Sequence, residues 1–379
     1  MSKARLLILS FSNIASDARV LKQVRLFVDR YEVTTCGYGP SPDPRVHHRQ
    51  LDDENGFSTW TRHDLALRRF TTIYWNLPAV VQAQNLLASS DPFDAVIAND
   101  IDTVGLALSL QAAHRVHADI HEFAPRQNEE LLMWRLFNAP YVRWMCRSFL
   151  PQVASMTTVG QGLADEYLRV FGLTAEIVTN ATPHADLNPQ PVGTPIKLVH
   201  SGASLRNRRL ETLVDAVKAT RTDVTLDLYL MGNDPDYIVE LGDRAAGSPR
   251  VRIREPLPYE HLIAKLNEYD IGVHVIAPTN FNNSWSLPNK FFDYVQARLG
   301  LIIGPSPEMR HLLEEHDLGA VTEDFSADAL TQVLDALTPE RVSQWKASAH
   351  DAARALSAEA QVAVWDKAVA SLLESPARG

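Results

Sequence analysis

Short apolar runs alternate with amphipathic stretches along the chain, and this alternation limits the fold more than any other feature. Several runs are apolar throughout, as parallel strands covered on both faces are. Between two of them, residues 210–217 repeat apolar side chains at the spacing of one helix face. Strands that alternate with helices predict an α/β fold with parallel sheets. The expected strands are residues 6–11, 32–38, 95–99, 118–122, 155–159, 177–180, 197–201, 225–231, 251–254, 271–276, 301–304 and 320–322.

A proline-rich gap divides these strands into two groups of six. Residues 182–195 hold four prolines in fourteen positions and few apolar side chains, which is typical of a stiff polar linker. We therefore expect an N-terminal Rossmann-like domain over residues 1–182 and a C-terminal one over residues 196–350. Residues 351–379 are expected to form a helix that packs back toward the N-terminal domain. Parallel sheets bind ligands at the carboxyl ends of their strands, so two of them imply a cleft between the domains.

Composition excludes several kinds of protein. The 379 residues are 45% hydrophobic, which is ample for two buried cores. No window approaches the roughly 18 apolar residues of a membrane span, and residues 6–9 are too short a run for a signal peptide. The two cysteines, Cys36 and Cys146, allow no disulfide framework and no cysteine-rich metal site. The net charge of −10 argues against nucleic acid as a partner, and we expect a cytoplasmic protein.

The segment from Asn282 to Ala297 carries the clearest chemical signal. Pro288 suits the first turn of a helix, which places Lys290 where the helix dipole disfavours a cation. A ligand phosphate at the helix end would explain a lysine there. The alternative is a pair between Lys290 and Asp293 on a solvated helix face, and the spacing alone does not decide between the two.

Three arginines follow the first strand after the linker. Gly202 would let a ligand approach the backbone, and Arg206, Arg208 and Arg209 could reach an anion. Taken alone, such a cluster is more often solvated than bound to a ligand.

Five segments, found in the same order along the chain, resemble glycosyltransferase family 4. This resemblance implies a GT-B fold, in which two Rossmann-like domains face an interdomain cleft. It also implies transfer of a sugar from a nucleoside-diphosphate-sugar to a glycan, lipid-linked or small-molecule acceptor, with retention of configuration. A nucleotide-sugar epimerase of the same fold and a non-catalytic nucleotide-sugar-binding partner are the alternatives. The segments are residues 16–20, 97–103, 118–123, 200–211 and 288–305.

The resemblance assigns roles to the matching residues. Arg208 and Lys290 would hold the donor diphosphate, and His121 would face the transferred sugar; these three form the expected catalytic set. Asp293 would accept hydrogen bonds from the ribose hydroxyls. The other expected donor-site residues are Gly202, Asn282, Asn283, Ser284, Trp285 and Asn289, and the expected acceptor or phosphate loop contains Ser12, Asn13 and Asp17. Without the resemblance, His121 would equally suit a core histidine that follows a strand.

The chain also departs from the family pattern. Trp285 stands where relatives carry the first of two glutamates, and Asp293 takes the place of the second. Ala203 stands where many relatives have a second phosphate-binding arginine, while Arg209 and Arg298 occupy positions where glycine is common. These changes leave the identity of the donor sugar open.

Two further features bear on metals and membranes. Asp100-Ile-Asp102 is an Asp-x-Asp, which holds a divalent metal in a different glycosyltransferase fold. Here it follows a strand and opens a helix, so we interpret it as structural and expect no metal and no cofactor besides the nucleotide-sugar co-substrate. Residues 134–147 are basic, aromatic and amphipathic. This composition suits peripheral contact with the inner face of a membrane or a helix packed on the N-terminal sheet.

Overall fold

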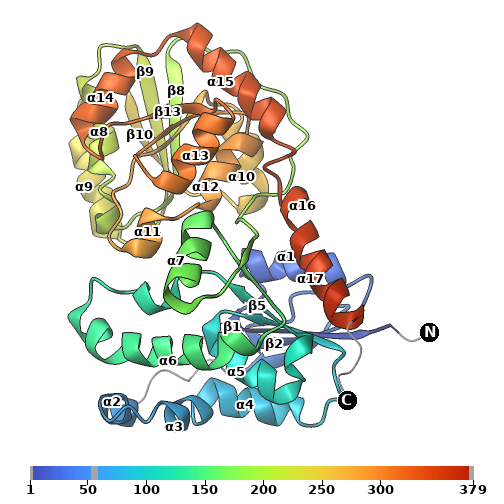
Figure 1. Cartoon of the computed structure of the whole chain (residues 1–379). Coiled ribbons are helices and arrows are strands. Elements are labelled where there is room, and N and C mark those ends of the chain that lie inside the picture. The colour runs from blue at the N-terminus through green and yellow to red at the C-terminus, as the bar shows by residue number, and fades with distance from the viewer. Residues whose placement is uncertain (1–2, 53–58, 375–379) are drawn as a thin grey trace. The chain divides into compact units, whose positions relative to one another are not determined.

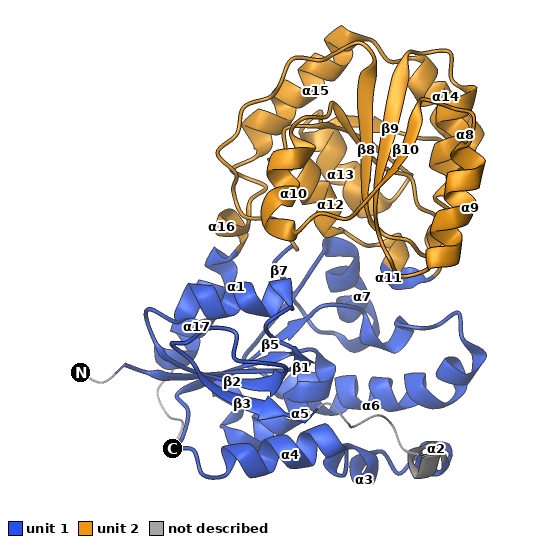
Figure 2. Cartoon of the chain, turned by 180° about the vertical axis from the view of Figure 1, so that it is seen from behind, with its two compact units in different colours: residues 1–179, 280–282, 362–379 blue, residues 180–279, 283–361 orange. Residues whose placement is uncertain are grey.

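The computed structural model describes residues 3–52 and 59–374, in which parallel strands alternate with helices (Figure 1). The chain forms two compact units, shown in blue and orange in Figure 2. Unit 1 comprises residues 1–179, 280–282 and 362–379. Unit 2 comprises residues 180–279 and 283–361. Each unit is built around one sheet.

The sheet of unit 1 has the strand order β3-β2-β1-β4-β5-β6-β7, and all its neighbouring strands are parallel. The chain runs outward from β1 to one edge and then returns to β4 to build the other, so β1 and β4 mark the point where the order reverses. Ligands of doubly wound sheets bind at this point. The strands are β1 (Arg5–Asn13), β2 (Glu32–Tyr38), β3 (His47–Leu51), β4 (Ala95–Asn99), β5 (Val116–Ile120), β6 (Ser155–Thr158) and β7 (Glu176–Ile177).

Helices cover both faces of this sheet (Figure 1). Helices α1 and α17 lie on one face, where Trp365 is fully buried against Leu6 and Ile8 of β1. Helices α4, α5 and α6 lie on the other face (Figure 1). The helices of unit 1 are α1 (Ala18–Phe27), α2 (Thr59–Ala66), α3 (Phe70–Trp75), α4 (Pro78–Leu87), α5 (Ile101–Leu110), α6 (Ala139–Phe149), α7 (Gln161–Phe171) and α17 (Ala363–Glu374).

The sheet of unit 2 repeats this topology with the order β10-β9-β8-β11-β12-β13, again parallel throughout. The order reverses between β8 and β11, which are direct neighbours. The carboxyl ends of these two strands are therefore the expected ligand site of unit 2. The strands are β8 (Ile196–Ala203), β9 (Val224–Met231), β10 (Val251–Arg254), β11 (Ile271–His274), β12 (Gly300–Ile303) and β13 (Gly319–Val321).

Alternating side chains of these strands fill two core layers. Leu198 packs in the layer under α8, α9 and α14, whereas the next residue, Val199, packs in the layer under α10, α12 and α13. Figures 1 and 2 show these two groups of helices on opposite faces of the sheet. The helices are α8 (Glu211–Ala219), α9 (Pro235–Ala245), α10 (Tyr259–Leu266), α12 (Asn289–Gln296), α13 (Pro307–Glu315), α14 (Ala327–Asp335), α15 (Pro339–Ala352) and α16 (Ala358–Gln361), with α11 (Phe281–Ser284) at the unit boundary.

Each expected strand corresponds to an observed strand. All twelve expected runs contain or overlap a strand, and in the described part of the chain only β3 was not expected. The reason is that β3 reads His-His-Arg-Gln-Leu, a polar sequence that an edge strand tolerates because one of its sides is unpaired.

The observed units divide the chain differently from the expected domains. Residues 182–195, expected as a stiff polar linker, belong to unit 2, where the buried guanidinium of Arg298 donates a 2.6 Å hydrogen bond to the carbonyl of Ala185. Residues 351–379 do not form one helix. The chain leaves unit 2 after residue 361, and α17 packs in unit 1, while residues 375–379 lie outside the described residues. No helix in the described ranges combines the length and apolarity needed to cross a membrane.

Candidate active site

The carboxyl edge of the unit 2 sheet brings Gly202 and Lys290 into contact. Gly202, near the end of β8, has φ +144°, a backbone conformation that favours glycine. A β-carbon at this position would lie 2.3 Å from Nζ of Lys290. The ammonium group therefore lies directly against the backbone where β8 ends, and the close approach requires that residue 202 has no side chain.

A cavity of about 280 Å³ lies at the same edge, beyond the carboxyl ends of β11 and β12. Pro288, the residue that precedes α12, lines it together with Arg208. The helix thus directs the positive end of its dipole toward a site that already holds a cation, which is an arrangement suited to an anionic ligand. The polar lining residues are Arg208, His274, Asn283, Ser284, Ser286 and Ser306.

The three arginines predicted near an anion differ in their partners. Arg206 forms ion pairs with Asp234 at 3.0 Å and Glu240 at 2.7 Å. Arg209 lies 3.7 Å from Glu211. Arg208 has no ion pair in the part of the chain that the structure describes, and it alone of the three lines the cavity. Arg208 is therefore the arginine whose charge is available to a ligand.

Burial and a neighbouring cation disfavour the charged form of Lys290, and an anion bound beside it would stabilise that form. Burial, followed by the charge of Arg208, lowers the pKa of Lys290 to about 8, and Asp293 opposes this shift. Asp293 is 3% exposed and accepts hydrogen bonds from Thr182 Oγ1 at 2.6 Å and from the Tyr259 hydroxyl at 3.1 Å. The alternative of a lysine–aspartate pair on a solvated face does not describe a carboxylate this deeply buried.

Two neutral histidines complete this edge. Burial, followed by the charge of Lys290, lowers the pKa of His200 to about 3, and the same two causes hold the pKa of His274 well below its usual value. The two rings stack at 6.3 Å, and His200 Nδ1 lies 2.9 Å from the carbonyl oxygen of Val273. His274 Nδ1 is buried without a hydrogen-bond partner among the described residues. His274 was not predicted from the sequence; its position at the end of β11, beside β8, is the signal that could have revealed it.

In unit 1, His121 follows β5 and lies between two carboxylates. Its Nδ1 is 3.2 Å from Asp100 and its Nε2 is 3.4 Å from Asp119. Burial lowers the pKa of His121, but Asp100 and Asp119 outweigh it and the pKa lies above its usual value. The charged imidazolium is therefore favoured, so His121 can present a proton or a positive charge at this edge.

Asp119 is the centre of a buried polar network. Arg19 donates to it from Nη2 at 2.6 Å and from Nε at 2.8 Å, and the side chains of Gln23 and Thr157 each donate at 2.7 Å. Burial raises the pKa of Asp119, but Arg19 and His121 hold it well below its usual value. Asp100 of the Asp-x-Asp motif has φ +62° and receives a hydrogen bond from the backbone N–H of His121, so this carboxylate orients the histidine.

The predicted first loop is organised by its own aspartate. Asp17 caps α1 by accepting from the backbone N–H groups of Arg19 at 3.0 Å and Val20 at 3.2 Å, and Ser12 donates to it at 2.8 Å. Asn13 accepts from the N–H of Asp17 through its carbonyl. A carboxylate therefore already fills the helix N-terminus at which a donor phosphate would otherwise bind.

The remaining predicted donor residues lie in different places. Asn283 and Ser284 line the unit 2 cavity. Asn282 belongs to unit 1, where its side-chain oxygen accepts from the N–H of Phe123 at 2.9 Å. Trp285 is half-buried and Asn289 is exposed, and neither lines the cavity as far as the structure describes the chain.

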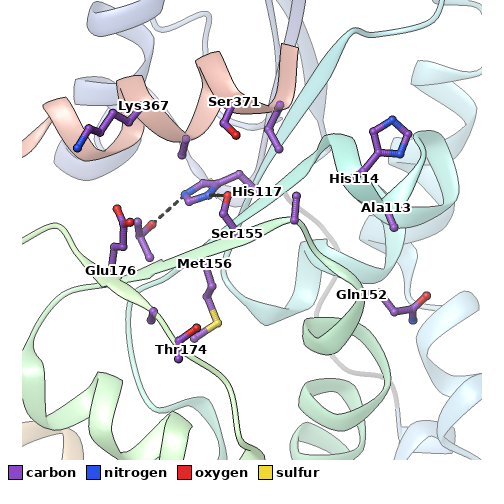
Figure 3. Close-up of a pocket in the computed structure, with 15 residues that line it drawn as sticks. Ala113, His114, His117, Gln152, Ser155, Met156, Thr174, Glu176, Lys367 and Ser371 are labelled. Carbon is purple, nitrogen blue, oxygen red and sulfur yellow. Dashed lines mark hydrogen bonds between the residues drawn. The ribbon is translucent and has the colours of Figure 1, made fainter. Parts of the chain in front are cut away.

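A larger cavity, of about 1240 Å³, lies at the amino ends of β5, β6 and β7 beside α17 (Figure 3). His117 faces it with both ring nitrogens engaged, Nδ1 at 2.8 Å from Ser155 and Nε2 at 3.0 Å from Thr157. Burial lowers the pKa of His117 to about 4, so this ring is neutral. The cavity lies at the opposite end of the strands from His121, away from the edge where such sheets bind ligands.

The chain was compared with protein families, curated sequences and solved structures. No protein-family model and no curated protein sequence matches the chain. Among solved structures, sucrose-phosphate synthase from Thermosynechococcus elongatus has a TM-score of 0.73 at 13% identity, over 98% of this chain and 99% of the other. Anabaena HepE in complex with UDP and glucose has a TM-score of 0.67 at 12% identity, over 97% and 100%. The chain has the GT-B fold.

A third solved structure is also similar to this chain. WaaG, a glycosyltransferase involved in lipopolysaccharide biosynthesis, has a TM-score of 0.64 at 11% identity, over 95% of this chain and 99% of the other. The predicted α/β architecture of GT-B type is therefore confirmed. Because identities are this low, the comparisons establish the fold, and the roles of His121, Arg208 and Lys290 stay predictions.

Proposed function

We propose that this protein is a glycosyltransferase that moves a sugar from a nucleoside-diphosphate-sugar donor to an acceptor. The observation that carries the proposal is the pair of cations at the carboxyl edge of the unit 2 sheet. Arg208, which no carboxylate neutralises among the described residues, lines a cavity at the N-terminus of α12, and Lys290 projects from the first turn of that helix. HepE, which shares the GT-B fold, was solved with UDP and glucose, which supports a nucleotide-sugar as the ligand.

Catalysis would then rest on positioning and electrostatics. Negative charge grows on the departing diphosphate as the glycosidic bond to the donor breaks. Arg208, Lys290 and the N-terminal amides of α12 would stabilise that charge in a site that is partly shielded from water. His121, whose raised pKa favours the imidazolium, would face the transferred sugar. The resemblance to family 4 supports retention of configuration, and no protein nucleophile is required.

The acceptor we propose is a glycan or a lipid-linked precursor, and we propose that the protein meets it at the inner face of a membrane as a peripheral protein. The basic and aromatic residues 134–147 support this choice. WaaG, which has the same fold, acts in lipopolysaccharide biosynthesis. A soluble small-molecule acceptor is the competing outcome, and the comparisons do not favour an epimerase.

Nucleotide binding is the first test. UDP, GDP, ADP and dTDP are each added to the full chain, and the melting temperature is measured. A nucleotide at a hundred times its dissociation constant adds about 2.7 kcal/mol of stability, so the correct base should stand out. Consumption of the matching nucleotide-sugar is then followed with and without candidate acceptors. Stabilisation without any turnover would favour a non-catalytic binding partner, and no stabilisation by any of the four would refute the proposed donor site.

Metal dependence is the second test. We propose that transfer needs no divalent metal, because Arg208, Lys290 and a helix end would neutralise the diphosphate. Transfer should therefore survive an excess of chelator, and Asp100→Asn should act only through stability or through the pKa of His121, which the charge of Asp100 raises. Activity that is lost in chelator and restored by magnesium or manganese would show that the Asp-x-Asp motif binds a metal.

A further inference from the structure

Acidic residues are absent from two long segments of unit 1, although the chain as a whole carries a net charge of −10. Residues 65–90 and residues 131–164 contain no aspartate or glutamate, and they hold arginines at positions 68, 69, 135, 143 and 147. The fold brings these segments together. The ring of Phe70, which begins α3, lies 5.7 Å from that of Tyr141 and 6.0 Å from that of Trp144, both on α6. Two segments that lack acidic side chains therefore meet at one surface, where α3 packs against α6.

This surface contains a groove of about 520 Å³. Arg143 and Arg147 stand one turn apart on α6, and both are exposed. Neither they nor Arg68 has an ion pair in the portion of the chain that the structure describes. Three unpaired guanidinium groups around two aromatic rings form a site suited to a phosphate, because guanidinium binds phosphate oxygens in a bidentate fashion. The residues that line the groove are Arg68, Phe70, Pro140, Arg143, Trp144 and Arg147.

Large apolar side chains are exposed immediately before α6. Leu131, Leu132, Met133 and Leu136 are each more than half exposed. Single exposed apolar residues are ordinary, but four within six positions form a patch of the kind that marks an interaction site. Because the patch adjoins the arginine-bearing helix, apolar and cationic groups lie side by side, as they do in segments that lie in the interface of a bilayer.

We propose that Leu131, Leu132, Met133 and Leu136 insert into an anionic bilayer while Arg68, Arg143 and Arg147 bind its lipid phosphates. We call these seven residues the bilayer surface. The proposal rests on the proposed membrane contact and names its residues and its lipid chemistry. A bilayer is favoured over an acidic protein because a lipid offers both acyl chains for the exposed apolar side chains and phosphate for the arginines.

Vesicle binding tests the proposal without any assay of transfer. The full chain is sedimented with phosphatidylcholine vesicles and with vesicles that contain about 30% phosphatidylglycerol, at low and at high salt. Binding should need phosphatidylglycerol and weaken as salt is added. Each arginine near an anionic surface contributes about fivefold to binding, so Arg143→Gln with Arg147→Gln should lose about 25-fold. Leu132→Ser with Met133→Ser should also release the protein from these vesicles.

A matched pair in unit 2, Arg221→Gln with Arg310→Gln, removes the same charge from exposed positions and should bind the vesicles like the wild type. Equal binding to both lipid compositions, or wild-type binding by the Arg143 and Arg147 variant, would overturn the proposal. So would failure to bind either vesicle, or complete displacement of bound protein by millimolar glycerol phosphate, which would identify a soluble phosphate site. The melting-temperature shift with the stabilising nucleotide is measured on the same variants. It should be unchanged, so failure here leaves the donor site standing.

Discussion

Single residues distinguish the proposed donor site from an ordinary protein surface. Arg206 and Arg208 are two positions apart, yet the first is neutralised by Asp234 and Glu240 and the second lines the cavity. Lys290 touches the backbone at Gly202 and feels the charge of Arg208. These differences in partners, rather than the number of cations, support the anion site that we propose at this edge.

Removal of either cation should weaken nucleotide binding. Arg208→Ala and Lys290→Ala each delete a charge-assisted hydrogen bond worth about 1.5–3 kcal/mol. The dissociation constant of the stabilising nucleotide should therefore rise roughly tenfold to a hundredfold, with a larger loss in transfer rate because charge grows on the leaving phosphate. Titration calorimetry and the transfer rate check this. Arg206→Ala is the control, and wild-type affinity in both test variants would eliminate the proposed site.

The lowered pKa of Lys290 predicts a specific pH dependence. In the free protein this pKa is about 8, so the ammonium is charged below pH 8 and loses its proton above it. Only the charged form attracts a diphosphate, so affinity should be level near pH 7 and fall by up to about tenfold per pH unit well above pH 8. Isothermal titration from pH 7 to 9.5 measures the slope. The same slope in Lys290→Ala would show that another group is responsible.

At the scale of elements, contacts of Arg19 join two helices to the sheet of unit 1. Helix α1 is held to the sheet of unit 1 by Arg19, which makes two hydrogen bonds with the buried Asp119 and stacks 4.9 Å from the ring centroid of Trp365 on α17. Asp119 in turn lies 3.4 Å from His121. Asp119 therefore contributes both to the packing of two helices and, together with Asp100, to the charge of His121.

Loss of Arg19 should destabilise unit 1 strongly. Arg19→Met leaves Asp119 buried without its main cation, which costs about 3–5 kcal/mol. Asp119 has a lowered pKa, so its stabilising effect is present above its usual range and is lost as the pH falls through the lowered value. Denaturant unfolding at pH 7 measures the loss. Asp119→Leu in the same chain should recover part of it, and no recovery would show that Arg19 acts through other contacts.

Some helices, strands and site residues could be predicted from the sequence, and others could not. The apolar strands were recognisable because buried parallel strands have a local signature, whereas the prolines of residues 182–195 did not reveal that this segment packs within unit 2. Strand β3 and His274 were missed, since a polar edge strand lacks such a signature and the role of His274 depends on which strand lies beside it. Asn282 was expected with Asn283 and Ser284, yet it bonds Phe123, a residue 159 positions away. Such a contact is a product of the folded chain and has no local pattern.

At the scale of the whole molecule, each unit has its own core, and the end of the chain completes that of unit 1. Trp365, Val369 and Leu372 of α17 are buried against β1 and α1. The cavity that we propose binds the nucleotide, in contrast, is lined by unit 2 residues. Stability of one unit and ligand binding by the other should therefore respond to different substitutions.

Trp365→Ala should separate these two properties. Removal of a buried tryptophan costs about 3–5 kcal/mol, so unfolding of unit 1 should begin at a lower temperature. The stabilising nucleotide should still bind with wild-type affinity, because no residue of α17 lines its cavity in the described part of the chain. Calorimetric scans with and without nucleotide measure both. Lys367→Ala, an exposed change on the same helix, is the control, and a matching loss of nucleotide affinity in Trp365→Ala would contradict this division.

The way the backbone passes between the units limits how this protein can recombine with its relatives. Unit 1 takes residues 280–282 and 362–379 from the second half of the sequence, so neither unit is one continuous segment. A chimera joined at the linker would import a foreign Asn282 and a foreign Trp365 into this N-terminal half. Viable crossovers must therefore bring along a matching Phe123 loop and a matching surface for α17.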